Sequence, residues 1–231
     1  MKRLAVIPAR EGSKRIKNKN IKNFCGKPII SYALNAAKES GLFDTIHVST
    51  ESEEIANIVR DLGFTIDFLR DISLADDITP IIPVLKWVVE KYQSKNIYFD
   101  EVVLIMACAP LIDATDLKKA SLIMDKNNGA KSVISISSYP APIEWAFENK
   151  NTLLTPVNPG MFKIRSQDLT KKYYDTGAFI FFPVETILSS EGAGDDTGYV
   201  GYEIERLKAV DIDDQEDWEL AELTMRALLK K

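Results

Sequence analysis

The fold is decided near the start of the chain, by the stretch Ala5-Val6-Ile7-Pro8-Ala9-Arg10-Glu11-Gly12-Ser13-Lys14-Arg15. Its apolar part, residues 4–7, is typical of a buried strand, and Pro8 ends that strand. The loop that follows contains Gly12, which lets a ligand approach the backbone closely, and Ser13, which offers a hydroxyl. The stretch therefore predicts a strand that runs into a binding loop.

The loop is basic, which indicates an anionic ligand. Its side chains able to complement phosphate oxygens are Arg10, Lys14, Arg15 and Lys19. The loop matches neither the Walker A pattern nor the dinucleotide-binding glycine pattern. We expect it to hold a nucleotide triphosphate; the alternative is a solvated, lysine-rich surface loop.

Outward from this stretch, predicted strands and helices alternate. The apolar patterns predict strands over residues 4–7, 45–50, 64–69, 101–107, 130–136, 177–182 and 207–212. They predict helices over residues 28–41, 52–60, 80–92, 116–126 and 215–229. Such repeated units favour an α/β fold with a parallel sheet covered by helices on both faces. Residues 137–174 break the alternation, and we expect an excursion there, either a β-rich arm, a lid or a dimerisation element.

Composition excludes several kinds of protein. The chain has 231 residues, enough for one large α/β domain, and its net charge of −5 argues against a general nucleic-acid binder. No apolar run is long enough to span a bilayer, and a signal peptide would be broken at Pro8, so we expect a cytoplasmic protein with no membrane partner. Cys25 and Cys108 fit a reducing compartment, and His47 as the only histidine makes zinc sites and serine–histidine triads improbable.

Near the other end of the chain, Asp211 and Asp213 follow an apolar stretch. Period-two geometry points both carboxylates to one side, where they can share one Mg²⁺. The competing interpretation is that Asp213 or Asp214 caps the last helix. Likewise, the Asp76-Asp77 pair is interpreted as a helix cap, with ligand contact a minority alternative.

Motifs spread along the whole chain resemble those of a known family. The motifs that carry it are 7–16 with Lys19-Asn20, Gly26-Lys27-Pro28, Val48-Ser49-Thr50, Leu69-Arg70, Leu74-Ala75-Asp76-Asp77, Ala109-Pro110-Leu111, Asp211-Ile212-Asp213 and Asp217-Trp218-Glu219. Together they resemble the nonulosonate cytidylyltransferases, the group of the CMP-sialic acid synthetases, over nearly the whole chain. The resemblance is closest to the branch that acts on pseudaminic acid, on residues 23–28, 165–169 and 174–179.

The resemblance implies one Rossmann-like nucleotidyltransferase domain over residues 1–231, in which 137–174 serves dimerisation and the sugar site. It implies that the anomeric hydroxyl of a nine-carbon 2-keto sugar acid attacks the α-phosphorus of CTP, giving a CMP-sugar and pyrophosphate. Such a transfer needs charge neutralisation and in-line positioning more than covalent catalysis. The resemblance also suggests a homodimer and a product used in flagellin or surface-polysaccharide modification.

Carried over to this chain, the resemblance assigns roles by position. It makes Arg10 and Lys19 catalytic, as groups that stabilise charge on the α-phosphate. The nucleotide-binding residues it implies are Ala9, Arg10, Gly12, Ser13, Lys19, Asn20, Arg70 and Asp77. The sugar-binding residues it implies are Ala109, Arg165, Asp175, Gly177 and Ala178. Asp211 and Asp213 would hold Mg²⁺.

The sugar itself stays open at this point. Members that act on pseudaminic acid usually carry Ala-Gly-Gln where this chain has Thr176-Gly177-Ala178. A Gly-Ala pair there is more like the enzymes for sialic and legionaminic acid. CMP-legionaminate, CMP-N-acetylneuraminate and, further away, CMP-octulosonate synthetases remain alternatives. So do a uridylyl or guanylyl transferase and a non-catalytic nucleotide-binding module.

Overall fold

The computed structural model describes residues 1–194 and 198–229, and its core is a mixed six-stranded sheet with the strand order β10-β6-β9-β5-β1-β4. The strands of this sheet are β1 (Arg3–Pro8), β4 (Thr45–Ser49), β5 (Glu101–Ile105), β6 (Ser132–Ser138), β9 (Tyr173–Pro183) and β10 (Tyr199–Glu203). β1 pairs in parallel with β4 and β5, and β6 pairs in parallel with β10. β9 runs antiparallel to both of its neighbours, β5 and β6.

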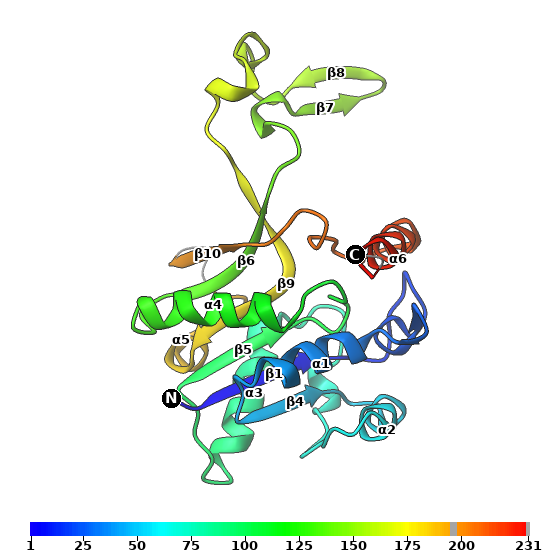
Figure 1. The fold of residues 1–231 in the computed structure, drawn as a ribbon, viewed down its shortest axis with the longest axis vertical. Helices are drawn as coiled ribbons and strands as arrows, with labels where there is room; N and C mark the ends of the chain where they lie inside the picture. Colours follow the sequence, from blue (N-terminus) through cyan, green and yellow to red (C-terminus); the bar gives the residue numbers. More distant parts are fainter. Residues whose placement is uncertain (195–197, 230–231) are drawn as a thin grey trace.

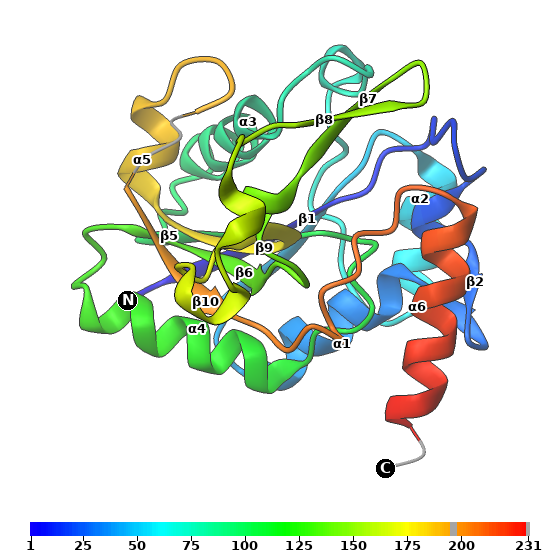
Figure 2. The same ribbon diagram turned by 90° about the horizontal axis from the view of Figure 1, so that it is seen from above.

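Helices cover both faces of the sheet, as expected (Figure 2). The helices are α1 (Ile30–Ser40), α2 (Glu53–Asp61), α3 (Ile81–Gln93), α4 (Ala114–Lys126), α5 (Val184–Ser189) and α6 (Gln215–Leu228). Apolar residues of α1, α2 and α4 pack against one face, and those of α3 and α5 pack against the other. No helix in the described residues is both long enough and apolar enough to span a membrane.

Local signals set most helix ends. Gly41 ends α1 in the left-handed conformation, at φ 64°, as a glycine after a helix does. Ser52 caps α2 by accepting a hydrogen bond from the Ile55 backbone N–H. The first helix, however, begins at Ile30 and not at Pro28, because Lys27–Pro28 (β3) pairs with Asn23–Phe24 (β2) in a short antiparallel ribbon.

Two of the predicted strands are wrong. Residues 64–69 and 207–212 belong to no sheet: the former form no ladder with the edge strand β4, and the latter begin in a turn at residues 206–208. Their apolar side chains still pack against the core, which explains the strand-like pattern. The edge strand β10 was not predicted, since Tyr199–Glu203 has little apolar character of its own.

The expected excursion is an arm that rises from the sheet between β6 and β9 (Figure 1). Its tip carries the antiparallel pair β7 (Phe147–Lys150) and β8 (Leu153–Pro156). The arm also explains the direction of β9: neighbouring antiparallel strands can be joined by a hairpin, whereas parallel neighbours need a crossover. Large apolar side chains are exposed along it, with Leu153 71%, Leu154 55% and Phe162 58% exposed.

Candidate active site

The carboxyl ends of β1, β4 and β5 point to one edge of the sheet, and a cleft of about 270 Å³ lies there. It is lined by Pro8, Arg10, Ser13, Lys14, Arg15, Ile16, Lys19, Asn20, Arg70, Leu74, Asp76, Asp77, Thr79, Ile81, Val84, Met106, Cys108 and Asp213. Open α/β sheets bind ligands at such an edge. The basic loop after β1 thus forms one wall, and the segment after β10 reaches the same cleft.

The last helix holds the two walls together. Trp218 and Met225 of α6 pack with Ile16 and Phe24, so the helix rests on the basic loop and on the β2–β3 ribbon (Figure 2). The rings of Phe24 and Trp218 meet edge to face, with centroids 5.4 Å apart. This packing places the segment before α6 beside the loop.

Lys19 is the residue through which the loop meets that segment. Its Nζ donates to the Ile212 carbonyl at 2.5 Å and lies 3.7 Å from Asp213 Oδ1. Arg15 pairs with the same Asp213 oxygen at 2.8 Å. The side chain of Lys19 is only 17% exposed, so its charge acts across a partly desolvated space.

Asp211 and Asp213 flank the buried Ile212 in the segment that leads to α6. No residue of the described chain donates a hydrogen bond to Asp211 or forms an ion pair with it. Burial, followed by the nearby carboxylate of Asp213, raises the pKa of Asp211. Asp214, and not Asp213, caps α6, in a reciprocal capping box with Asp217. Asp211 is therefore free to face a ligand, whereas Asp213 is paired with Arg15 and lies near Lys19.

Gly177 brings β9 to this carboxylate. The pairing of β9 with β6 is irregular between Ile134 and Ile136, and Gly177 lies in that bulge at φ 63°. A Cβ on Gly177 would lie 3.3 Å from Asp211 Oδ2. Asp175 accepts a hydrogen bond from the Gly177 backbone N–H, and it is one of the carboxylates that raise the pKa of Asp211. Two of the expected sugar-side residues thus adjoin the expected metal pair.

On the opposite side of the cleft, Asp77 bridges two cations of the basic loop. Its carboxylate accepts from Arg10 Nη1 at 2.6 Å and also pairs with Lys14 Nζ. These two contacts lower the pKa of Asp77. Neither aspartate here is a helix cap, because Asp76 accepts from the backbone of its own turn and Pro80 precedes α3.

Arg70 and Asn20 are both buried at the cleft. Asn20 donates to the Arg10 carbonyl at 3.0 Å, which braces the loop from within. Arg70 forms a buried ion pair with Glu51, at 2.6 Å between Nη2 and Oε2. The sequence did not identify Glu51 as the partner of Arg70.

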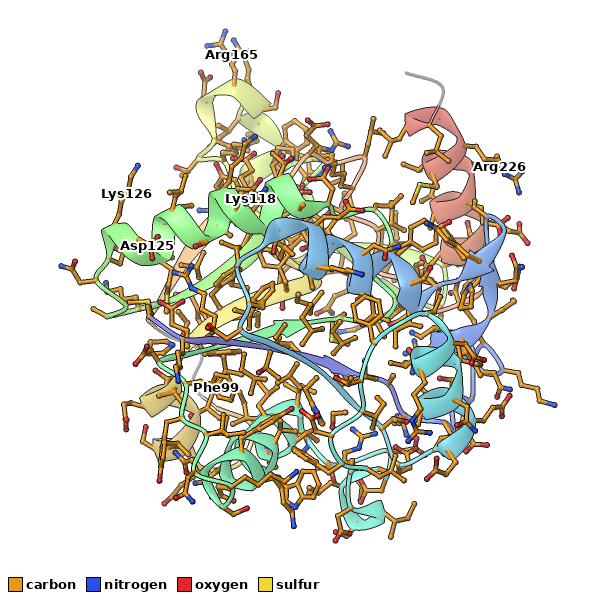
Figure 3. The ribbon with its side chains drawn as sticks, turned by 60° about the horizontal axis from the view of Figure 1, so that its bottom comes forward. Phe99, Lys118, Asp125, Lys126, Arg165 and Arg226 are labelled. Atoms are coloured by element: carbon orange, nitrogen blue, oxygen red, sulfur yellow. The ribbon has the colours of Figure 1, made fainter. Side chains whose placement is uncertain are left out.

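Several expected site residues do not line the cleft. Ala9 is fully buried in the core, and Gly12 lies on the exposed side of the loop. Ala109 and Ala178 are buried behind the cleft, where the Ala178 carbonyl accepts from Met106 N–H. Arg165 lies on the arm, pairs with Asp168 at 2.8 Å and points away from the body of the molecule (Figure 3).

Three further residues, His47, Cys108 and Met106, have no assigned chemical role, although two of them line the cleft. His47 is buried, and burial lowers its pKa to about 4, so it is a packed residue of the core. Cys108 lines the cleft, but burial raises the pKa of its thiol, which disfavours a nucleophilic role. Met106 lines it too, and no sequence pattern singled it out.

Known proteins resemble this chain over its length. The family model for cytidylyltransferases matches residues 4–223. The pseudaminic acid cytidylyltransferase of Campylobacter jejuni serotype O:2 is 41% identical over 78% of each chain. The CMP-N,N'-diacetyllegionaminic acid synthase of Legionella pneumophila is 34% identical over 68% of this chain and 67% of its own.

A solved structure supports the fold. The structure of CMP:2-keto-3-deoxy-manno-octonic acid synthetase complexed with CTP matches with a TM-score of 0.72 and 15% identity, over 99% of this chain and 100% of its own. At that identity the likeness concerns the mostly parallel nucleotidyltransferase fold. The family match and the close relatives carry the assignment further: this chain belongs to the cytidylyltransferase family of nucleotidyltransferases.

Proposed function

We propose that this enzyme transfers CMP from CTP to a nonulosonic acid, with pseudaminic acid as the first candidate and legionaminic or N-acetylneuraminic acid as the alternatives. The observation that carries the proposal is the meeting of the basic loop with the Asp211–Asp213 segment in one cleft. The 41% identity to a pseudaminic acid cytidylyltransferase, against 34% to a legionaminic acid synthase, sets the order of the sugars.

The nucleotide occupies the cleft edge formed by the basic loop. Arg10, Lys19 and Ser13 offer their donors to phosphate oxygens, and Arg70 lines the same space. The anomeric hydroxyl of the sugar attacks the α-phosphorus and gives up its proton to water, and pyrophosphate leaves with the electrons of the broken P–O bond. Arg10 and Lys19 stabilise the charge that grows on the α-phosphate, in a site where Lys19 is already partly desolvated.

A divalent cation fits the carboxylate pair. Asp211 forms no ion pair within the described residues, and its pKa is raised by burial and then by the neighbouring carboxylates, against the opposing charge of Lys19. Oxygen donors suit Mg²⁺, which binds through one or two carboxylates and completes its shell with phosphate oxygens and water. Asp211 and Asp213 would hold the ion, which would supply charge neutralisation and a template for the phosphates.

The sugar lies on the β9 side, beside Asp175 and Gly177. Arg165 is suited to a carboxylate but projects from the arm, so we propose that it serves the site of a second copy of the chain. The exposed apolar side chains of the arm, including Leu153 and Leu154, support a homodimer formed through this segment. Sedimentation of the wild type, and of a variant with both leucines changed to lysine, tests it: the variant should become monomeric.

The decisive experiment is a sugar panel with CTP and Mg²⁺. Pyrophosphate release is expected with pseudaminic acid, and the legionaminic, N-acetylneuraminic and octulosonic acids are the comparison arms. Turnover of a different sugar would reassign the substrate, and silence with all of them from folded protein would overturn the proposed function. We also place the reaction in the cytoplasm, in keeping with the unpaired Cys25 and Cys108.

A further inference from the structure

Glu51 lies two residues after the end of β4, and its carboxylate joins two walls of the cleft. One oxygen, Oε2, accepts from Arg70 Nη2 at 2.6 Å. The other, Oε1, accepts from the backbone N–H of Glu11 in the basic loop at 2.8 Å. The side chain of Glu51 is 9% exposed and that of Arg70 is 3% exposed, so the ion pair is shielded from water.

Backbone hydrogen bonds bring the same segments together. The Ala9 N–H donates to the Ser49 carbonyl at 2.9 Å, and the Arg70 N–H donates to the Thr50 carbonyl at 2.8 Å. These bonds hold the loop after β1 and Arg70, which lines the cleft, beside the end of β4. The Glu51 carboxylate adds the side-chain link between them, and it is held from both sides.

A carboxylate is the group this position requires. Both of its oxygens accept hydrogen bonds, whereas an amide has one accepting oxygen and one donating nitrogen. Glutamine at position 51 would therefore leave either Arg70 or the Glu11 N–H facing a donor. Arg70 has few other partners, since its Nε is buried without a hydrogen bond in the described chain. Without Glu51 the buried guanidinium would lose its counter-ion.

We propose that Glu51 is a positioning residue for the nucleotide: it holds Arg70 and the basic loop in the one geometry that binds CTP. The inference rests on the proposed function, since it takes CTP as the ligand. A buried ion pair adds little net stability compared with apolar side chains of similar size. Its value at this position is preorganisation, because the ligand then meets donors that are already oriented.

The chain provides a matched control. Glu101 pairs with Arg3 at 2.6 Å, with side chains 2% and 11% exposed, so this ion pair is as short and nearly as buried. Glu101 begins β5, so it lies at the amino ends of the strands, away from the cleft at their carboxyl ends. Glu51→Gln and Glu101→Gln should both lower the melting temperature, but a purely structural role predicts no change in nucleotide affinity for either.

The test is the Kd for CTP, measured by calorimetry with excess Mg²⁺ on folded protein. Glu51→Gln should raise it about tenfold or more, as expected when a preoriented donor set is lost, and Glu101→Gln by less than about twofold. If Glu51→Gln binds CTP as the wild type does, the inference is wrong and the proposed function stands. If the wild type binds no CTP, both are overturned.

A double-mutant cycle tests the route through Arg70. In an Arg70→Gln background, Glu51→Gln should weaken CTP binding much less than it does alone, because the residue it positions is gone. Full additivity would overturn the route. Should Glu51→Gln fail to fold, Glu51→Asp keeps both accepting oxygens but withdraws them by one methylene. It should then weaken CTP binding, and an unchanged Kd would refute the inference.

Discussion

Gly177→Ala tests whether the bulge of β9 and the Asp211 carboxylate form one site. Gly177 has φ 63°, a conformation that L-residues with a Cβ adopt only with strain. The new methyl group would lie 3.3 Å from Asp211 Oδ2 and 3.4 Å from its Cγ. Both distances are at or below ordinary van der Waals contact, so the carboxylate has to move by a few tenths of an ångström.

Gly177→Ala should have two effects, one on stability and one on turnover. The left-handed backbone costs about 1 kcal/mol, which lowers the melting temperature of a chain of this size by about 2–4 °C. The displaced carboxylate is one that we assign to Mg²⁺, an ion with strict octahedral geometry. Misplacing a catalytic group by about 1 Å can reduce the rate about 100-fold, so a shift of a few tenths should reduce turnover about tenfold.

Gly41→Ala is the control, since Gly41 has φ 64° and no atom within 4 Å of an added Cβ. It incurs the same backbone penalty at the end of α1, away from the cleft. The assay is pyrophosphate release from CTP and the sugar, as a function of Mg²⁺ concentration. Gly177→Ala should need more Mg²⁺ for half-maximal rate, whereas Gly41→Ala should not. Equal loss of stability with equal, undiminished turnover in both variants would refute the reasoning.

Three further predictions concern the cleft and the core. Lys19→Met should lower turnover about 100- to 1000-fold, as the loss of one preorganised charge does. Lys22→Met is the control, because Lys22 does not line the cleft, and it should leave turnover unchanged. Similar rates for the two variants would contradict the catalytic role of Lys19. Asp77→Asn should tighten CTP binding severalfold at low salt, because it frees the cations of Arg10 and Lys14. Calorimetry on the control Asp71→Asn should show no change in CTP affinity. Weaker CTP binding by Asp77→Asn would contradict this prediction. His47 has a folded pKa of about 4, below the ordinary 6.5, so its unfolded form binds the proton first; urea unfolding should show stability falling as pH drops from 6.5 towards 4, and His47→Phe should flatten that slope.

Elements defined by local chemistry were predictable from the sequence. The strand Arg3–Pro8, the glycine after α1 and the serine cap of α2 are all set by neighbours in the chain. The strands predicted at 64–69 and 207–212 failed because strand formation needs a partner, and an apolar alternation does not say whether a free edge is available.

The candidate site shows the same division. The basic loop and the aspartate pair were identified separately and joined by a family resemblance, and in the structure Asp213 of that pair lines the same cleft as the loop. Glu51 was missed because its partners, Glu11 and Arg70, become neighbours only when β1 and β4 pair. A signal existed: an acidic residue lies two residues after a buried strand, at the edge where ligands bind.

The contact between α6 and the basic loop also has a consequence for synthesis of the protein on the ribosome. Lys19 contacts Ile212, and Phe24 contacts Trp218. The two residues of each pair are far apart in the sequence, Lys19 and Ile212 by 193 positions. Contacts so distant in sequence form late, since closing a long loop costs conformational entropy. A nascent chain that still lacks α6 can pair its first strands but leaves the loop without its support. The cleft is thus completed only after α6 has emerged from the ribosome, so a nascent chain that stops short of α6 should lack the folded cleft.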